Sequence, residues 1–519
     1  MLDRTYYPRL QLPDAWKPED LDRIVGGRFG VLGGVATRRS QTYYDTFEWN
    51  LWFRDRRLFV ENHHLCLCDV KRDGSERTLS VCPAPTGEWR FAADVDSPCM
   101  QAALKPLLKL RAARPVAELD AAVRTYSLLD EHGKIVFRFD IAKWLLPGKA
   151  RKAFCLLLQP QPLRGYDTEA SAALALLRET GAQATPHDPL AAFFGYTGKA
   201  PEPYSLRPAF GLQADMTAHE ACRLISSRML AIARVNEAGI IDDTDTEFLH
   251  DYRICIRKMR SVLGLIKGVY PLASIKNLKS RLRTLARETN HLRDLDVYLL
   301  ACADYRRMLP PGLHPGLRRL FDYYTAAREA EYARLRRILK SAGYQRRMRT
   351  LDGFFTNVGK NAVGPEGRGL IGDLVTPCIR KTYRRIRRFA RTLTDETTEA
   401  EVHALRIRCK KLRYLLEFFR ELYDPERVDG IVAVLKKLQT RLGDFNDYAV
   451  QKDALMRVAD DEALGGAEPQ QAIGGLVTAL HARQQEARAG IAAVLTRFSD
   501  TAMAEVVASL LPTGDGVES

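Results

Sequence analysis

Long apolar runs are missing from this 519-residue chain. No stretch approaches the roughly 18 consecutive apolar residues that a membrane-spanning helix needs. The first residues of the sequence are charged and aromatic, whereas a signal peptide has an apolar core. The ten cysteines are scattered without a Cys-x-x-Cys pair, which is typical of reduced thiols and not of a disulfide framework. These absences predict a cytoplasmic protein with no membrane partner.

Acidic residues are also in short supply. Asp and Glu number 64 against 79 Lys and Arg, which gives a formal net charge of +15. A basic balance of this size favours a polyanionic partner. The excess lies between residues 251 and 450, which hold 42 Lys and Arg against 22 Asp and Glu. One part of the chain therefore carries the polyanion signal, and the first two hundred residues do not belong to it.

Hydrophobic patterning divides the chain in two. Short strand-like runs separated by Asp and Gly turns fill the first part, and a helical period begins near residue 168. Proline-containing segments mark a boundary near residues 190–212, and from about residue 216 the apolar spacing is helical. We expect strands at residues 41–44, 58–60, 65–70, 78–82, 123–129 and 135–140.

The fold class that follows is α+β with more than one domain. A β-rich domain is expected over residues 1–200, and an all-α helical-bundle domain over residues 213–519. Glycines between residues 341 and 372 predict that the helical domain has two halves, at about 213–345 and 370–510.

The strongest signal in the sequence is an internal repeat. Residues 249–260 align without a gap with residues 402–413, and both read His-x-x-Arg-x-x-x-(Arg/Lys)-Lys-x-Arg. Each copy follows a Thr…Glu capping box, at 244–247 and at 398–401, which predicts a helix start before each histidine. At about 100° per residue, four donors in each copy share one helix face. They are His250, Arg253, Arg257 and Arg260 in the first copy and His403, Arg406, Lys410 and Arg413 in the second.

Two interpretations of this basic face compete. On a single helix, a charge run usually does no more than keep the helix solvated, and a lone histidine is more often structural. A histidine and three cations repeated at fixed positions indicate instead a ligand that needs several donors. The acidic residues of 292–298 and 442–448 are expected to pair with nearby arginines. Further basic stripes add the candidates Lys279, Arg283, Arg287, Arg384, Arg388, Lys436 and Lys437.

The repeated motifs resemble the CHAD family of histidine-marked helical domains, over residues 215–510. The resemblance rests on the His250 and His403 motifs together with residues 292–297 and 442–447, which recur in the same order in both halves. It implies binding of inorganic polyphosphate in a basic groove or pore between the halves, and association with polyphosphate-containing granules. It also implies phosphate contacts for the eight donors of the two repeated helices.

The first part of the chain resembles the CYTH, or triphosphate-tunnel, family through the Tyr-Tyr-Asp-Thr of residues 43–46 and through residues 107–116. The resemblance implies an antiparallel β-barrel whose tunnel binds triphosphate with a metal. Three motifs of that family are absent, at residues 6–12, 64–68 and 154–158, so the metal carboxylates and the phosphate-binding arginines are missing there. We therefore expect no catalytic residues, no cofactor, no metal and no enzymatic activity.

Three alternatives stay open. A triphosphatase with rearranged ligands would use nearby carboxylates such as Asp45, Glu48 and Asp140. A nucleic-acid binder would need aromatic rings on the basic face, and Tyr252 and Tyr383 lie near it in sequence, although Tyr252 falls about 100° or more from the arc of donors. Alternation along one strand gives His64, Cys66 and Cys68 a common face, which is a weak candidate for a soft metal and more typical of core packing.

Overall fold

The computed structural model divides into two compact units, residues 1–205 and 206–519. It describes residues 9–13, 15–71, 76–147, 152–161, 163–179, 181–185, 188–357, 363–394 and 397–510. The start of the first missing motif (residues 6–8), the turn at 72–74 and Gly359 lie outside the described residues.

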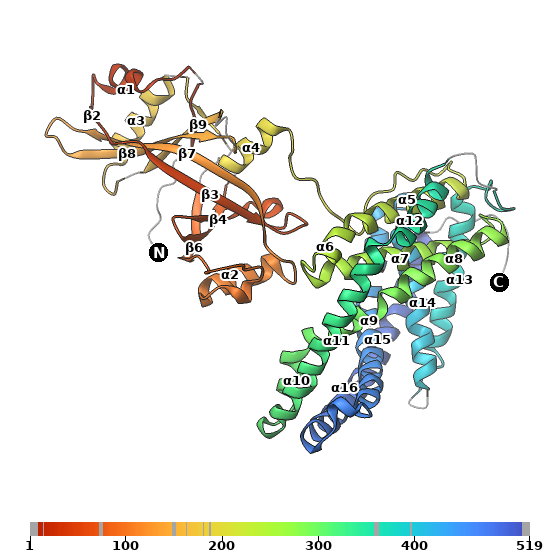
Figure 1. The fold of residues 1–519 in the computed structure, drawn as a ribbon. Coiled ribbons are helices and arrows are strands. Elements are labelled where there is room, and N and C mark those ends of the chain that lie inside the picture. The colour runs from red at the N-terminus through yellow and green to blue at the C-terminus, as the bar shows by residue number, and fades with distance from the viewer. Residues whose placement is uncertain are drawn as a thin grey trace. The chain divides into compact units, whose positions relative to one another are not determined.

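The N-terminal unit contains one antiparallel sheet with helices packed on it (Figure 1). All six predicted strands fall within observed strands, although helices α2 and α4 were not expected. The strands are β1 (Leu10–Gln11), β2 (Gly30–Gly33), β3 (Thr37–Asp45), β4 (Arg56–Glu61), β5 (His64–Val70), β6 (Glu76–Pro83), β7 (Arg114–Leu129), β8 (Ile135–Leu145), β9 (Ala153–Gln161) and β10 (Gln183–Ala184). The helices are α1 (Pro18–Val25), α2 (Pro98–Leu108), α3 (Asp167–Glu179) and α4 (Pro189–Thr197).

The strand order shows how this sheet curls. The order is β10-β1-β9-β8-β7-β3-β4-β5-β6, with β2 paired to β7, and every pairing is antiparallel. Arg9, next to β1, forms a 3.0 Å ion pair with Glu76 of β6, although these strands stand near opposite ends of the order. In a closed barrel, backbone hydrogen bonds would join the two ends of the sheet. Among the described residues, the side-chain ion pair of Arg9 and Glu76 links the two ends of the curled sheet instead. The predicted antiparallel class is confirmed.

Alternation along the strands separates the inside of the curled sheet from the outside. Phe137 and Phe139 of β8 face outward and pack against α1 and α3 through residues such as Leu21 and Leu174. On another outer stretch, α2 covers β4 and β5. Apolar residues of the inner face, such as Tyr43 and Trp144, share a cluster with Phe194 of α4. Charged groups on the same inner face surround a cavity, described below.

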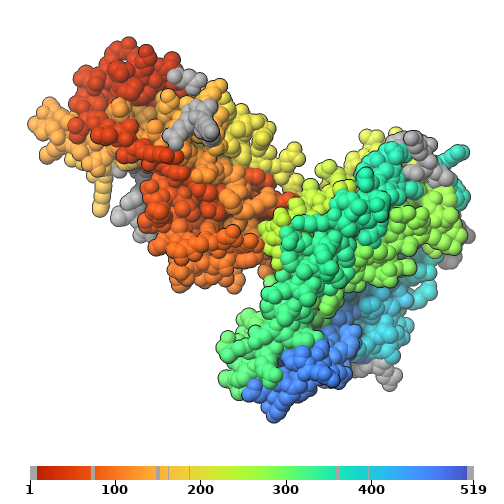
Figure 2. Space-filling model, viewed as in Figure 1, coloured from red at the N-terminus to blue at the C-terminus, as the bar shows by residue number. Residues whose placement is uncertain are grey.

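The C-terminal unit is all-α in its described residues, as predicted. Figure 2 shows α11, in green, side by side with α16, in blue, and the two share an apolar cluster that includes Leu320, Tyr324 and Leu476. No helix in the described part of the chain combines the length and the apolar character needed to span a bilayer. The helices are α5 (Ala218–Val235), α6 (Glu237–Ile241), α7 (Thr246–Leu265), α8 (Leu272–Glu288), α9 (Asn290–Leu300), α10 (Cys302–Met308), α11 (His314–Lys340), α12 (Ala342–Thr356), α13 (Ile371–Ala390), α14 (Glu399–Phe418), α15 (Pro425–Ala459), α16 (Ala467–Ser499) and α17 (Thr501–Leu510).

Two local predictions about the helices are corrected. The first expected capping box is absent, because Asp245, and not Thr244, caps α7 by accepting hydrogen bonds from the amides of Glu247 and Phe248. The second is present, with Thr398 as the N-cap of α14 and Glu401 completing the box. Two of the glycines expected to break the chain, Gly343 and Gly353, lie inside α12, since neither needs a left-handed backbone.

A close backbone approach follows α12. The Gly364 amide donates a 2.8 Å hydrogen bond to the carbonyl of Val269. A Cβ at Gly364 would lie 2.2 Å from the carbonyl oxygen of Gly268, so only glycine fits there. The segment that leads into α13 is thereby docked against the loop between α7 and α8.

Asp188 makes the most enclosed charged contact of the N-terminal unit. It is 0% exposed, caps α4 through the amides of Leu190 and Ala191, and forms a 2.8 Å ion pair with Arg57. Arg57 is itself buried, and its guanidinium lies 4.2 Å from the ring centre of Trp52.

We predict that Asp188→Ala lowers the free energy of unfolding of the N-terminal unit by about 3–5 kcal/mol, because it leaves a buried cation without its partner. Urea denaturation followed by circular dichroism measures the change. The matched control is Asp22→Ala, at an exposed position of α1 whose carboxylate has no partner among the described residues. Equal midpoints for the two variants would contradict the prediction.

Candidate functional site

The two repeated helices, α7 and α14, pack against each other. Each places small and apolar side chains inward, such as Cys255 and Met259 on α7 and Cys409 and Leu412 on α14, all at most 1% exposed. The helical period therefore leaves the basic residues of both copies on the other face. The local sequence thus accounts for the two cationic helix faces. The packing of α7 against α14 brings these two faces next to each other.

Four cations gather where the two helices meet: Arg257 of α7 and Arg406, Lys410 and Arg413 of α14. We call them the central cluster. Burial, together with the positive charges of Arg406 and Arg257, lowers the pKa of Lys410 to about 8, and Asp447 opposes this shift. The Lys410 ammonium has no ion pair or hydrogen bond among the described residues. The central cluster is therefore a concentration of positive charge with an incomplete set of counter-ions.

Among the described residues, carboxylates form ion pairs with Arg406 and Arg413 of the central cluster and not with Arg257 or Lys410. Arg406 donates to Asp447 of α15 at 3.1 Å, and Arg413 lies 3.7 Å from Glu417. Glu417 is shared, since it also forms a 3.1 Å ion pair with Arg207.

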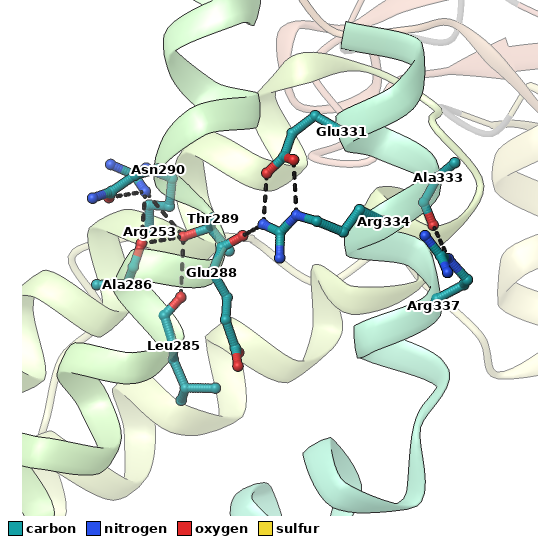
Figure 3. Close-up of polar contacts among 10 residues, drawn as sticks. All are labelled: Arg253, Leu285, Ala286, Glu288, Thr289, Asn290, Glu331, Ala333, Arg334 and Arg337. Carbon is teal, nitrogen blue, oxygen red and sulfur yellow. Dashed lines mark hydrogen bonds and ion pairs between the residues drawn. The ribbon is translucent and has the colours of Figure 1, made fainter. Parts of the chain in front are cut away.

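Arg253 of α7 reaches the junction of α8 and α9 (Figure 3). Its Nη1 donates to the carbonyl of Ala286 at 3.2 Å, to the hydroxyl of Thr289 at 2.9 Å and to the side chain of Asn290 at 2.8 Å. At the same junction Arg334 of α11 donates to the carbonyl of Glu288 at 2.8 Å. Burial lowers the pKa of Arg253, and the neighbouring arginines add to the effect. The structure thus gives Arg253 a bracing role between helices.

The acidic motifs that recur after each basic helix pair with arginines, as predicted. Asp296 accepts from Arg328 at 2.7 Å, and Arg328 also binds Asp243 in a bidentate contact. In the second half Asp447 binds Arg406, and the neighbouring Asn446 bonds the ring of His403. His403 is exposed and His250 is half-buried on α7.

A second group of cations lies at the carboxyl end of α7. A Cβ at Gly264 would lie 3.7 Å from Nζ of Lys279, so this α8 lysine rests on α7. Burial lowers the pKa of Lys279, and the positive charge of Lys267 contributes. Lys267 and Lys381 both face Cys378, whose thiol contacts the carbonyl of Leu265. Sequence reasoning missed Lys267, which follows the helix and has no periodic signal; the free carbonyls at a helix end favour cations there.

The remaining candidates are solvent-exposed. In the described part of the structure none of their side chains has a hydrogen bond or an ion pair, and we call them the outer cations. Arg260 lies on α7, Arg283 and Arg287 on α8, Arg384 and Arg388 on α13, and Lys436 and Lys437 on α15.

Lys258, the motif lysine between Arg257 and Arg260, does not belong to this face. It is 5% exposed, and its ammonium donates a 2.7 Å hydrogen bond to the carbonyl of Leu206. Glu421 accepts from the amides of Phe210 and Leu212, at 2.6 Å each. The segment 206–212 is thereby fastened across the helices.

Aromatic rings are not presented on the basic face at the two positions considered. Tyr252 is 0% exposed, and its hydroxyl bonds that of Tyr344. Tyr383 is 4% exposed and packs on Phe498. Neither ring is available for stacking on a base.

The inner face of the N-terminal sheet lines a cavity of about 390 Å³. Its charged residues form ion pairs: Arg9 with Glu76 at 3.0 Å, and Arg39 with Glu61 at 2.9 Å and with Asp140 at 3.2 Å. His64, Cys66 and Cys68 share the cavity wall, yet the described residues contain no group of three ligands able to hold a metal ion.

Of the three carboxylates considered for a rearranged active site, only Asp140 lines the cavity. Asp45 accepts hydrogen bonds from the amides of Thr46, Leu51 and Trp52 and so shapes a turn. Glu48 binds Arg111 at 2.8 Å.

The helical unit is similar to known proteins. Residues 225–456 match the family model of the CHAD domain. The crystal structure of the CHAD domain from the plant Ricinus communis is 26% identical, covers 56% of this chain and 95% of its own, and has a TM-score of 0.46. No curated protein sequence matches.

Two further solved structures are similar to the N-terminal region. A protein from Hippeastrum, described as having a dominant triphosphatase activity, is 10% identical over 37% of this chain and 95% of its own, with a TM-score of 0.25. A candidate adenylate cyclase from Bacillus halodurans is 11% identical over 34% of this chain and 91% of its own, with a TM-score of 0.22.

The C-terminal unit belongs to the class of duplicated helical domains that gather cations on a pair of packed helices. Residues 225–456 of this unit match the CHAD domain, as the His250 and His403 motifs predicted.

The prediction that the chain is not an enzyme is wrong. A structure similar to its N-terminal region comes from a protein with a described triphosphatase activity. The prediction compared three short motifs with fixed positions of the chain. The cavity takes its charged groups from elsewhere, namely from β3, β4, β6, β8 and the residue before β1. The absence of those motifs therefore does not establish the absence of ligands.

We predict that Arg253→Ala lowers the free energy of unfolding of the helical unit by about 1–3 kcal/mol, because three acceptors at the α8–α9 junction lose a charged donor. Thermal and urea denaturation of the full chain measure the loss. Arg260→Ala, on the same helix at an exposed position, should change the stability by less than about 0.5 kcal/mol. The reverse order of effects would place Arg253 on the solvent-facing side.

Proposed function

We propose that the helical unit binds inorganic polyphosphate at the central cluster and at outer cations such as Arg260, and that this binding associates the protein with polyphosphate granules. The observation that carries the proposal is the half-buried Lys410, which stands among three arginines without a counter-ion of its own. A polyanion laid across α7 and α14 would supply the missing charge. Arginine forks add bidentate contacts to phosphate oxygens.

The spacing of the cations suits this ligand. Side chains three or four residues apart on a helix lie about 5–6 Å from each other, and polyphosphate repeats its charges closely along the chain. The resemblance to CHAD domains implies the same ligand. The revised set of contact residues is Arg257, Arg260, Arg406, Lys410 and Arg413, with His403 at one end, and it leaves out Arg253, whose donor Nη1 is already engaged.

Single-stranded nucleic acid is the weaker candidate. Such strands gain about 1–3 kcal/mol for each base that stacks on an exposed ring. Tyr252 and Tyr383, the two rings considered for stacking on a base, are buried.

We predict that replacing Arg257, Arg260 and Lys410 together by Ala weakens polyphosphate binding at least about tenfold, since three charge contacts of about 0.5–1 kcal/mol each are lost. Fluorescence anisotropy with labelled polyphosphate and the full chain measures the affinity, and circular dichroism verifies the helicity.

The matched control removes the same charge elsewhere on the helical unit. Arg318, Arg336 and Arg346 are exposed, and the described residues give their side chains no partner. Replacing these three by Ala should change the affinity by less than about threefold. An equal loss in both triple variants would show that net charge alone, and not the central cluster, accounts for binding.

We also predict that polyphosphate bound to the full chain resists displacement by single-stranded DNA or RNA of equal charge at fixed ionic strength. Both ligands release counter-ions, so salt dependence does not separate them, whereas competition does. Displacement at comparable concentrations of charge would favour nucleic acid as the ligand.

A further inference from the structure

Lys410 differs chemically from the other lysines of the helical unit. Its amine faces Arg257 from α7, Arg406 and Arg413 from its own helix, and Asp447 from α15. Asp447 is already bound to Arg406. Lys258 is also buried, but its ammonium is committed to a backbone carbonyl. Lys410 thus combines a half-buried amine, an incomplete counter-charge and three guanidinium groups around it.

The protonation state of this amine matters for its reactivity. The pKa of Lys410 is lowered to about 8, so near pH 8 about half of the amine is neutral, against well under 1% for a lysine with the ordinary pKa of about 10.4. A neutral amine is a nucleophile, and arginines beside it are suited to hold a phosphate group. Held in this way, a phosphate would bring whatever it carries next to the amine.

We propose that Lys410 is a self-acylation site for acyl phosphates, small mixed anhydrides whose phosphate binds the arginines of the central cluster. The inference rests on the phosphate affinity proposed above. The Lys410 nitrogen attacks the carbonyl carbon, and the bond from that carbon to the phosphate oxygen breaks. The electron pair leaves with inorganic phosphate, the nitrogen loses one proton to solvent, and an amide remains. No oxidant or reductant is required.

The modification would act on the ligand-binding face itself. An amide at Lys410 carries no charge, so each acylation removes one cation from the central cluster and weakens its attraction for a polyanion. A higher concentration of acyl phosphate would therefore weaken polyphosphate binding through the modification of this one side chain.

The test uses the full chain and acetyl phosphate at pH 8, with acetylation of each lysine measured by peptide mass spectrometry. Lys411, the next residue of α14, is exposed and has no side-chain partner among the described residues, which makes it the internal control. Lys410 should acetylate at least about tenfold faster than Lys411, and tripolyphosphate should protect it. Equal rates at the two lysines would overturn the proposal.

A second reagent tests the role of the phosphate. The N-hydroxysuccinimide ester of acetic acid carries the same acetyl group without phosphate. Arg257→Gln should lower the acetylation of Lys410 by acetyl phosphate severalfold more than its acetylation by the ester. If the variant lowers both to the same extent, the arginine does not position the phosphate, and the proposal fails.

The outcome is separable from that of the proposed function. Polyphosphate affinity is measured on unmodified protein, before and after acetyl phosphate treatment, in the native chain and in Lys410→Arg. Treatment should weaken binding by the native chain and leave the affinity of Lys410→Arg as it was before treatment. Binding by unmodified protein without any acetylation of Lys410 would overturn this inference alone, whereas acetylation without polyphosphate binding would overturn the proposed function alone.

Discussion

The apolar contact between α7 and α14 is the constraint on which the basic site depends. The two helices pack against each other, and cations of both copies, such as Arg257 and Lys410, become neighbours as a consequence. Neighbouring like charges repel each other, and this repulsion offsets part of the hydrophobic stabilisation of the folded chain. A bound polyanion relieves that repulsion. The site is therefore preorganised by its core and gains most from a multivalent ligand of opposite charge.

The sequence predicted the helix faces better than the direction of individual side chains. A repeat of three and four residues defines a face, and both basic faces exist. The repeat does not show which residues of other helices lie against that face. Arg253 is an example, because its partners Ala286, Thr289 and Asn290 are more than thirty residues away in the chain. Lys267 was missed for the opposite reason, because it stands in a loop where no periodicity marks it.

In the N-terminal unit, alternation and turn residues located six strands, but they located neither β1, β2, β9 and β10 nor the cavity. Arg39, Glu61 and Asp140 come from three different strands and meet because the sheet curls, a property of the whole strand order. Motif comparison examines consecutive residues, so it found charges missing at three places and had no means of finding these. Asp45 shows the converse error, since a carboxylate in a matching motif serves backbone amides of a turn.

Because Arg253 is engaged elsewhere, the two halves of the basic site offer unequal sets of cations. The proposed ligand, in contrast, is uniform along its length, and this uniformity has a statistical consequence for binding. A polyphosphate chain reads the same from both ends and repeats at every phosphate, so the protein has no direction or starting point to recognise. A long chain can occupy the central cluster in many registers of similar energy. Tenfold more registers are equivalent to about 1.4 kcal/mol of binding free energy. Preference for long chains would then arise from counting alone, with no additional contact, and a bound chain would be free to shift along the helices.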